Sequence, residues 1–281
     1  DNAWAGPAGL VGVAREAEAG YAGEELYFEP EGETPFVARC LAAVRHLLLT
    51  QTAPGETAAM VIEPELGEGG YLPAPPAFLR GLHSICREHG ILFVADEVQS
   101  GFLRTGEMFC IEHAGIDPDV IVMAKGIASG FPISAIGASR ALMDRWPIGA
   151  HGGTYGGNPI GAAAALATLD VLTAPGFTGH VRERADQLRT GLTRLAAAHP
   201  TIAEVRGLGL MVGTEFLTPS RHPDPERVAA VTGHCRDVGH LLLMNCGTYG
   251  NTLRWMPPLV VTETEIDTAL DAFGAALEAT A

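Results

Sequence analysis

Three short, unbroken apolar runs, residues 58–62, 91–95 and 120–124, constrain most strongly what this chain can fold into. Each run stops at a charged residue, in chain order Glu63, Asp96 and Lys125. Because the apolar residues are continuous rather than alternating, we expect strands buried on both faces, as in a parallel sheet covered by helices. A further run at 133–137 extends the pattern. The sequence therefore predicts an α/β fold with a mostly parallel sheet.

Helices are expected between and after these strands, because apolar residues recur there at helical spacing. The predicted helices lie at 36–50, 76–89, about 158–171, 181–198, 225–238 and 263–276. Short strands are expected around Val205 and at 210–216. The change of pattern after the third helix, at about 158–171, predicts a large domain, 1–172, followed by a smaller α+β C-terminal domain, 173–281.

Charge and cysteine content exclude several classes of protein. With 18 basic and 33 acidic residues the net charge is −15, which argues against nucleic acid or an anionic membrane as the main partner. No apolar run is long enough to span a bilayer. The five cysteines are widely spaced, and neither they nor His234 and His240 form a metal-ligand pattern, so no metal site is expected. Residues 1–10 do not resemble a signal peptide, and a reducing cytoplasm is the expected location.

The charged residues at the strand ends suggest a ligand site. In an open α/β sheet, ligands bind beyond the carboxyl ends of the strands. Lys125 is suited to form a Schiff base with a carbonyl compound, and a carboxylate such as Asp96 could hold the pyridinium nitrogen of pyridoxal phosphate. Alternatively, Asp96 caps a turn and Lys125 makes a surface ion pair. Position alone favours this second interpretation, because most charged residues at strand ends are merely solvated.

Four sequence blocks decide between these interpretations by resemblance. They read EPELGEGG at 63–70, DEVQSGFLRTG at 96–106, AKGIASGFP at 124–132 and GTYGGNP at 153–159. Their sequences and order resemble the class III (ω-amino acid) aminotransferases, which are pyridoxal-phosphate enzymes of fold type I. The resemblance covers most of the chain from about residue 57 onward. It implies a transaminase with an α/β fold of that type.

The resemblance also implies roles for particular residues of the cofactor site. Lys125 would form the internal aldimine with pyridoxal phosphate and move a proton between substrate and cofactor. Asp96 would pair with the pyridine nitrogen, Val98 would pack on the ring, and Gln99 would hydrogen-bond the ring hydroxyl. Thr154 would reach the cofactor phosphate of a neighbouring subunit, which implies a homodimer with shared sites.

A further block at 246–259 resembles the 4-aminobutyrate aminotransferase branch of the family. There Arg254 would bind the α-carboxylate of glutamate or 2-oxoglutarate in bidentate fashion. Glu68 would pair with Arg254 when the substrate lacks that carboxylate, and Glu63 is also expected among the substrate-binding residues. A salt bridge between domains is the alternative role for Arg254. Arg206, beside a glycine-rich strand at 207–213, is expected to be structural.

The family's front third has no counterpart in this sequence. We find no Ser-Gly-(Ser/Thr)-Glu-Ala phosphate turn and no aromatic-His-Gly stretch, and residues 1–35 match no expected segment, so 1–172 is a partial cofactor-binding domain. The favoured function is amino transfer from an ω-amino acid, the donor, to a 2-oxo acid acceptor, 2-oxoglutarate. An aminomutase or decarboxylase on the same cofactor, or a non-catalytic truncated paralogue, are the alternatives.

Overall fold

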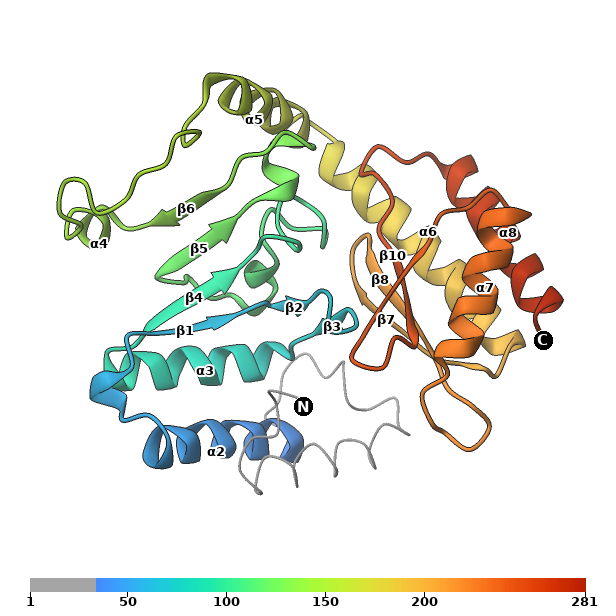
Figure 1. The fold of residues 1–281 in the computed structure, drawn as a ribbon, viewed down its shortest axis with the longest axis horizontal. Coiled ribbons are helices and arrows are strands. Elements are labelled where there is room, and N and C mark those ends of the chain that lie inside the picture. Colours follow the sequence, from blue (N-terminus) through green and yellow to red (C-terminus); the bar gives the residue numbers. More distant parts are fainter. Residues whose placement is uncertain (1–33) are drawn as a thin grey trace.

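The computed structural model describes residues 34–281, and the stretch 1–33 lies outside the described residues. The first sheet has the order β1-β4-β5-β6. Its strands are β1 (Ala59–Ile62), β4 (Leu92–Asp96), β5 (Val120–Met123) and β6 (Ala135–Ala138). The first three strands are parallel, and β6 runs antiparallel to β5. The predicted α/β fold with a mostly parallel sheet is confirmed, and β6 is its antiparallel edge (Figure 1).

Two helices, α2 (Pro35–Thr50) and α3 (Pro76–His89), pack beside this sheet (Figure 1). Leu79, Leu82 and Ile85 of α3 form a buried cluster with Phe93 and Ala95 of β4. Proline opens α3, where its missing N–H costs no hydrogen bond. Gly90 ends the helix in the left-handed conformation, with a φ of 69°. The apolar stripe and the two helix-end signals explain why the predicted bounds of this helix, 76–89, match the structure.

The opposite face of the sheet is less covered than the sequence predicted. Val61 is 62% exposed and Ile136 is 44% exposed, so the expectation of strands buried on both faces is wrong for β1 and β6. A continuous apolar strand predicts that both of its faces are buried in the assembled protein. It does not predict whether this chain or another one covers them. Asp96, Val122 and Ile136 are register partners, and they therefore lie on this less covered face.

The second sheet is antiparallel, with the order β7-β8-β10-β9. Its strands are β7 (Ile202–Leu208), β8 (Met211–Phe216), β9 (Met244–Cys246) and β10 (Thr252–Trp255). The helices α6 (Phe177–Ala198), α7 (Pro225–Asp237) and α8 (Glu263–Ala279) lie beside it (Figure 1). Val212, Phe216, Leu253 and Trp255 face these helices in one buried core. The sequence predicted β7 and β8 but not β9 or β10.

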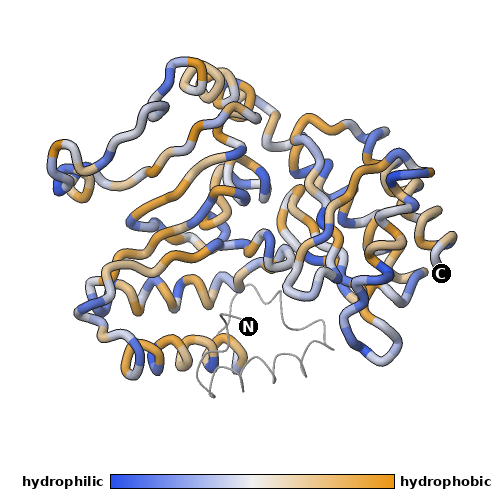
Figure 2. The backbone as a smooth tube through the Cα atoms, in the orientation of Figure 1, coloured by the Kyte–Doolittle hydropathy of each residue, from blue (hydrophilic) through white to orange (hydrophobic). Residues whose placement is uncertain are grey.

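The remaining strands, β2 (Glu65–Leu66) and β3 (Leu72–Pro73), form a separate two-stranded antiparallel sheet. The helices α4 (Arg140–Met143) and α5 (Pro159–Leu172) follow β6 in the chain. The predicted domain boundary at 172/173 falls between α5 and α6 and stays a prediction. Figure 2 shows the apolar segments concentrated in the strands and in the helix faces beside them. No single helix in the described part is long and apolar enough to cross a membrane; α5 and α6 together pass by length and composition only, with a 75° bend between them.

Candidate active site

The carboxyl ends of three neighbouring strands form one edge of the first sheet. Glu63 follows β1, Asp96 ends β4, and Lys125 follows β5 after a single alanine. Because β1, β4 and β5 are adjacent and parallel, these residues lie at the same edge. The structure thus assembles the strand-end residues that the sequence pattern singled out.

Asp96 is held by its own backbone turn. Its Oδ1 accepts a hydrogen bond from the Val98 N–H at 3.1 Å, and both residues are partly buried. No other hydrogen bond or ion pair to the carboxylate occurs within residues 34–281. One Asp96 oxygen is therefore fixed in orientation, and the other can bind a positively charged or N–H donor.

Lys125 begins a 3-10 turn, Lys125–Ala128, with a φ of 43°. A positive φ is uncommon outside glycine and marks local strain, which often occurs at functional sites. The side chain is exposed, and its amine makes no hydrogen bond or ion pair with any described residue. Lys125 is also the single lysine of the 281-residue sequence. It is therefore the only lysine in the chain that could form a Schiff base.

A cavity of about 910 Å³ opens beside Lys125. Gln99 and Phe102 from the loop after β4, and Met256 and Leu259 from the segment after β10, also line it. The cavity is thus bounded by segments from both halves of the chain. Its lining is mainly apolar, with few polar groups, as is usual for sites that bind small molecules.

Glu68 and Arg254 form an ion pair between the loop that joins β2 to β3 and strand β10. The Arg254 side chain is 11% exposed, and that of Glu68 is 70% exposed. The hydrogen bond from Arg254 lowers the pKa of Glu68, and the charge of Lys125 acts in the same direction. Gln99 Nε2 also donates to Glu68 Oε1 at 3.5 Å. The structure therefore brings together Glu68, Gln99 and Arg254, within electrostatic range of Lys125.

The Glu68–Arg254 contact agrees with two of the interpretations from the sequence. A substrate gate and a salt bridge between domains both require this pair. The Nε atom of Arg254 is buried and has no hydrogen-bond partner within the described residues, and its Nη2 donates to Met244 Sδ at 3.5 Å. Part of the guanidinium's donor capacity is therefore left for a further acceptor.

Glu63 and Gly67 shape the loop around Gln99. Glu63 Oε2 accepts a hydrogen bond from the Gly67 N–H at 2.8 Å, so this carboxylate closes the loop, and its role toward substrate stays a prediction. A Cβ on Gly67 would lie 2.1 Å from Gln99 Oε1. That oxygen is buried without a hydrogen-bond partner in the described part of the chain. Gln99 thus carries a free acceptor in the wall of the cavity.

Thr154 lies apart from these contacts. It is exposed in the segment between α4 and α5, and its side chain makes no hydrogen bond with residues 34–281. The predicted contact with the cofactor of another subunit is not tested by a single chain, and it stays a prediction. The site within this chain is therefore built without Thr154.

Glu97 is a residue of the site region that the sequence analysis did not single out. Its buried carboxylate accepts hydrogen bonds from Ser100 Oγ at 2.5 Å, from Cys110 N at 3.0 Å and from Ile111 N at 2.7 Å. Burial raises its pKa, against the lowering effect of these three bonds. Glu97 fixes the loop that begins at Asp96. In the sequence, only its position directly after the strand-end Asp96 could have pointed to Glu97 as a residue of this region.

Arg104 was also missed, and it joins the two halves of the chain. Its Nη1 donates to the carbonyl oxygens of Leu210 at 3.2 Å and Pro257 at 2.5 Å. Burial lowers its pKa to about 10. Arg104 thus fixes the position of the segment after β10 that lines the cavity. Its partners are main-chain atoms more than a hundred residues away, so no local pattern could reveal them.

Comparison with known proteins identifies the family. Residues 23–277 match the class III aminotransferase family. The chain belongs to the class III aminotransferases. The matched range begins inside the stretch 1–35 that motif comparison had left unmatched. The fold agrees with this family. An amine transaminase from an uncultivated Pseudomonas species, solved with pyridoxal phosphate bound, superposes with a TM-score of 0.82 at 29% identity, over 91% of this chain and 60% of its own.

Three curated relatives are aminotransferases whose names give different amino donors. The 4-aminobutyrate aminotransferase GabT of Escherichia coli (strain K12) is 40% identical over 82% of this chain and 54% of its own length. The 5-aminovalerate aminotransferase DavT of Pseudomonas putida is 39% identical with the same coverage. The acetylornithine aminotransferase of Rhodobacter capsulatus is 44% identical over 79% of this chain and 55% of its own length. The chain spans about half the length of the curated relatives it matches.

The residues of the site fit pyridoxal phosphate, the cofactor of this family. Lys125 supplies a free amine, Asp96 a carboxylate oxygen for a protonated ring nitrogen, and Gln99 a buried acceptor without a partner in residues 34–281. These are the three donor and acceptor types that its aldehyde, pyridinium nitrogen and ring hydroxyl require. In the same range, no group of three or more His, Cys, Asp or Glu residues could hold a metal ion.

Proposed function

We propose that this chain forms part of the active site of a pyridoxal-phosphate-dependent transaminase. It would transfer the amino group of an ω-amino acid, of the 4-aminobutyrate type, to 2-oxoglutarate. The observation that carries the proposal is the single lysine, Lys125, held in a strained turn at the sheet edge that also carries Asp96. The names of the relatives support the donor class, since two of them act on 4-aminobutyrate and 5-aminovalerate.

Each residue of the site has a defined task in this proposal. Bound pyridoxal phosphate supplies a conjugated ring that accepts electrons from the substrate carbon. Lys125 Nζ would hold the cofactor through its aldehyde, and its free amine would take a proton from the substrate carbon and deliver it to the cofactor. The Asp96 carboxylate would keep the ring nitrogen protonated, and Gln99 would hydrogen-bond the ring hydroxyl. Val98, two residues after Asp96 and next to Gln99, would pack against the ring.

Arg254 and Glu68 would select between the two substrates. A 2-oxo acid such as 2-oxoglutarate carries a carboxylate that needs a partner in a largely buried site. Arg254 offers a bidentate fork for it once Glu68 has moved away. An ω-amino donor has no carboxylate at that position, so Glu68 stays paired with Arg254. The exposed Glu68 side chain is free to make this movement, because packing does not hold it.

We further propose that two copies of the chain assemble around shared sites. Large apolar side chains near α5 are open to solvent in the single chain, including Tyr155 at 84%, Ile160 at 66% and Leu166 at 66% exposure. Exposed apolar patches of this kind mark interaction surfaces. Thr154 lies in the same region, which supports its predicted contact with the phosphate in the partner's site. A large domain at 1–172 and a small domain at 173–281 are part of this proposal.

Covalent labelling tests the central assignment. The protein is incubated with pyridoxal phosphate, reduced with borohydride and digested, and the labelled peptide is identified by mass spectrometry. We expect the pyridoxyl group on the peptide containing Lys125. A Lys125→Arg variant, which keeps the charge but cannot form the Schiff base, serves as the control. Label confined to the α-amino group, or equal label in the variant, would contradict the proposal.

A further inference from the structure

The second sheet places two arginines in one cross-strand row. Arg206 of β7 pairs with Gly213 of β8, and Gly213 pairs with Arg254 of β10. Side chains of directly opposite residues lie on the same face of a sheet, and neighbouring strands are about 4.8 Å apart. The two arginines therefore leave the same face, on either side of a residue that has no side chain.

The loop that carries Glu68 lies over this row. Arg206 donates to the Gly70 carbonyl oxygen twice, from Nε at 3.0 Å and from Nη2 at 2.8 Å. Two residues earlier in the loop, the Glu68 carboxylate pairs with Arg254. The carbonyl oxygen of Glu68 also accepts from the Gly247 N–H at 2.9 Å. The second sheet thus holds a loop that lies, in sequence, between two strands of the first sheet, β1 and β4.

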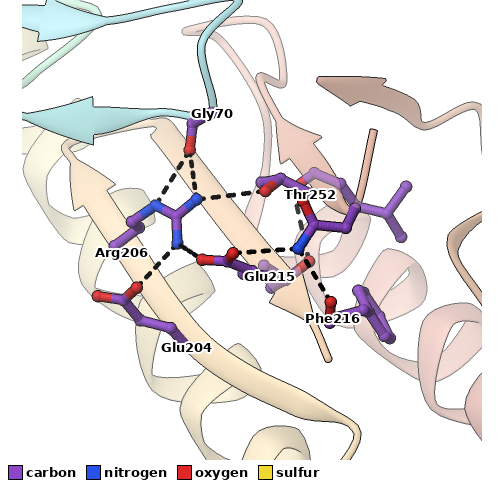
Figure 3. Close-up of polar contacts among 9 residues, drawn as sticks. Gly70, Glu204, Arg206, Glu215, Phe216 and Thr252 are labelled. Atoms are coloured by element: carbon purple, nitrogen blue, oxygen red, sulfur yellow. Dashed lines mark hydrogen bonds and ion pairs between the residues drawn. The ribbon is translucent and has the colours of Figure 1, made fainter. Parts of the chain in front are cut away.

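The Arg206 guanidinium is itself held firmly (Figure 3). It is 5% exposed, and it forms ion pairs with Glu204, at 2.8 Å, and with Glu215. Its Nη2 also donates to Thr252 Oγ1 at 3.2 Å. Thr252 and Arg254 lie two residues apart on β10, so they share a face. Arg206 therefore connects the Gly70 carbonyl to the strand that carries Arg254.

Gly213 leaves the space that this arrangement needs. A Cβ there would lie 3.2 Å from the Gly70 oxygen, 3.2 Å from Tyr71 Cβ and 3.1 Å from Thr252 Cγ2. Such contacts are tighter than ordinary van der Waals distances, so the loop would have to shift by a few tenths of an ångström. Substitution of Gly213 consequently offers a way to move the loop without changing either arginine.

We propose that Arg206 is a positioning residue, which fixes the loop 67–70 on the second sheet so that Glu68 competes with substrate for Arg254. The substrate part of this inference rests on the proposed function. Because the Glu68 side chain is 70% exposed, its position depends on the backbone that carries it. Loosening Gly70 lowers the local concentration of the Glu68 carboxylate at Arg254. A competing carboxylate then binds Arg254 more readily.

The test measures the pKa of the Glu68 carboxylate and does not depend on catalysis. The side-chain carboxyl carbons of glutamate are labelled with carbon-13, and the Glu68 signal is assigned by its loss in Glu68→Gln. Three variants are compared with the wild type: Arg206→Lys, Gly213→Ala and the control Arg182→Lys. Arg182 is a matched control because it also donates to a glycine carbonyl, Gly106 at 3.0 Å, and pairs with a glutamate, Glu107 at 2.6 Å, but away from the loop. Circular dichroism confirms that each variant is folded.

We expect the measured pKa of Glu68 to rise toward its ordinary value in Arg206→Lys and in Gly213→Ala, and to stay unchanged in Arg182→Lys. Addition of 2-oxoglutarate should displace Glu68 and shift its signal, with half-saturation at least about fivefold lower in the two loop variants. An unchanged Glu68 pKa in both folded loop variants would overturn the positioning role. No response of the wild type to 2-oxoglutarate, with the pKa shifts intact, would instead contradict the proposed function.

Discussion

At the scale of single residues, Asp96 offers a direct test of the proposed cofactor site. Replacing it with asparagine removes the charge but keeps the shape and the acceptor oxygen for the Val98 N–H. Loss of one preorganised charge beside the ring nitrogen costs about 3 kcal/mol of transition-state stabilisation, or about a hundredfold in rate. We expect that loss for Asp96→Asn in single-turnover measurements on the cofactor-loaded protein, with an unchanged urea midpoint. Turnover equal to the wild type would remove Asp96 from the cofactor site.

Arg254 distinguishes the two half-reactions. Arg254→Ala should raise the KM for 2-oxoglutarate or glutamate strongly, since their α-carboxylate would otherwise be buried without a partner. The KM for the ω-amino donor should change little, because Glu68 occupies Arg254 when that donor binds. Arg254→Lys should restore little, since a point charge cannot replace a bidentate fork. Separate kinetics of the two half-reactions measure this, and equal impairment of both would favour the salt bridge between domains.

At the scale of elements, the loop after β1 controls the position of Gln99. In Gly67→Ala the new Cβ would lie 2.1 Å from Gln99 Oε1, so the amide must leave its present position in the cavity wall. Because only the end of a flexible side chain moves, we expect a stability change within about 1 kcal/mol but weaker pyridoxal phosphate binding. Gly55→Ala is the control, since its Cβ would have no atom within 4 Å. Cofactor titration followed by absorbance should separate the two variants, and identical affinities would contradict this role of Gly67.

Some helices and strands could be predicted from the sequence, and others could not. The strands of the first sheet and α3 were predictable because apolar period, proline and glycine act locally. Strands β9 and β10 have only three and four residues, too few for an alternation of polar and apolar residues to be recognised, so they escaped detection. Glu68 and Arg254 were expected as a pair, but only by family resemblance. The row of Arg206, Gly213 and Arg254 depends on strand register, which tertiary packing sets, and no local pattern reports it.

At the scale of the whole molecule, Glu65 makes the joint between the two halves sensitive to pH. This fully buried residue of β2 accepts a hydrogen bond from the Leu208 N–H of β7 at 3.3 Å, and its Oε1 has no partner within residues 34–281. Burial raises its pKa well above the ordinary value; Glu97 acts in the same direction, and Arg189 and Arg206 act against it. The folded state therefore favours the protonated acid more than the unfolded chain does.

This difference gives stability a defined dependence on pH. Below the ordinary glutamate pKa, Glu65 is protonated in both states and contributes no pH dependence. As pH rises from there to the raised folded pKa, the unfolded chain loses its proton first, so the free energy of unfolding falls. Glu65→Gln stays neutral and should escape this fall, so its stability relative to the wild type should increase through that window and then level off. Urea unfolding at a series of pH values measures this difference in stability.

Glu88→Gln is the control. The hydrogen bond from Arg45 lowers the pKa of Glu88, so the small contribution of Glu88 to stability is lost as pH falls. A difference between Glu65→Gln and the wild type that does not vary with pH would mean that the buried carboxylate is not protonated on folding.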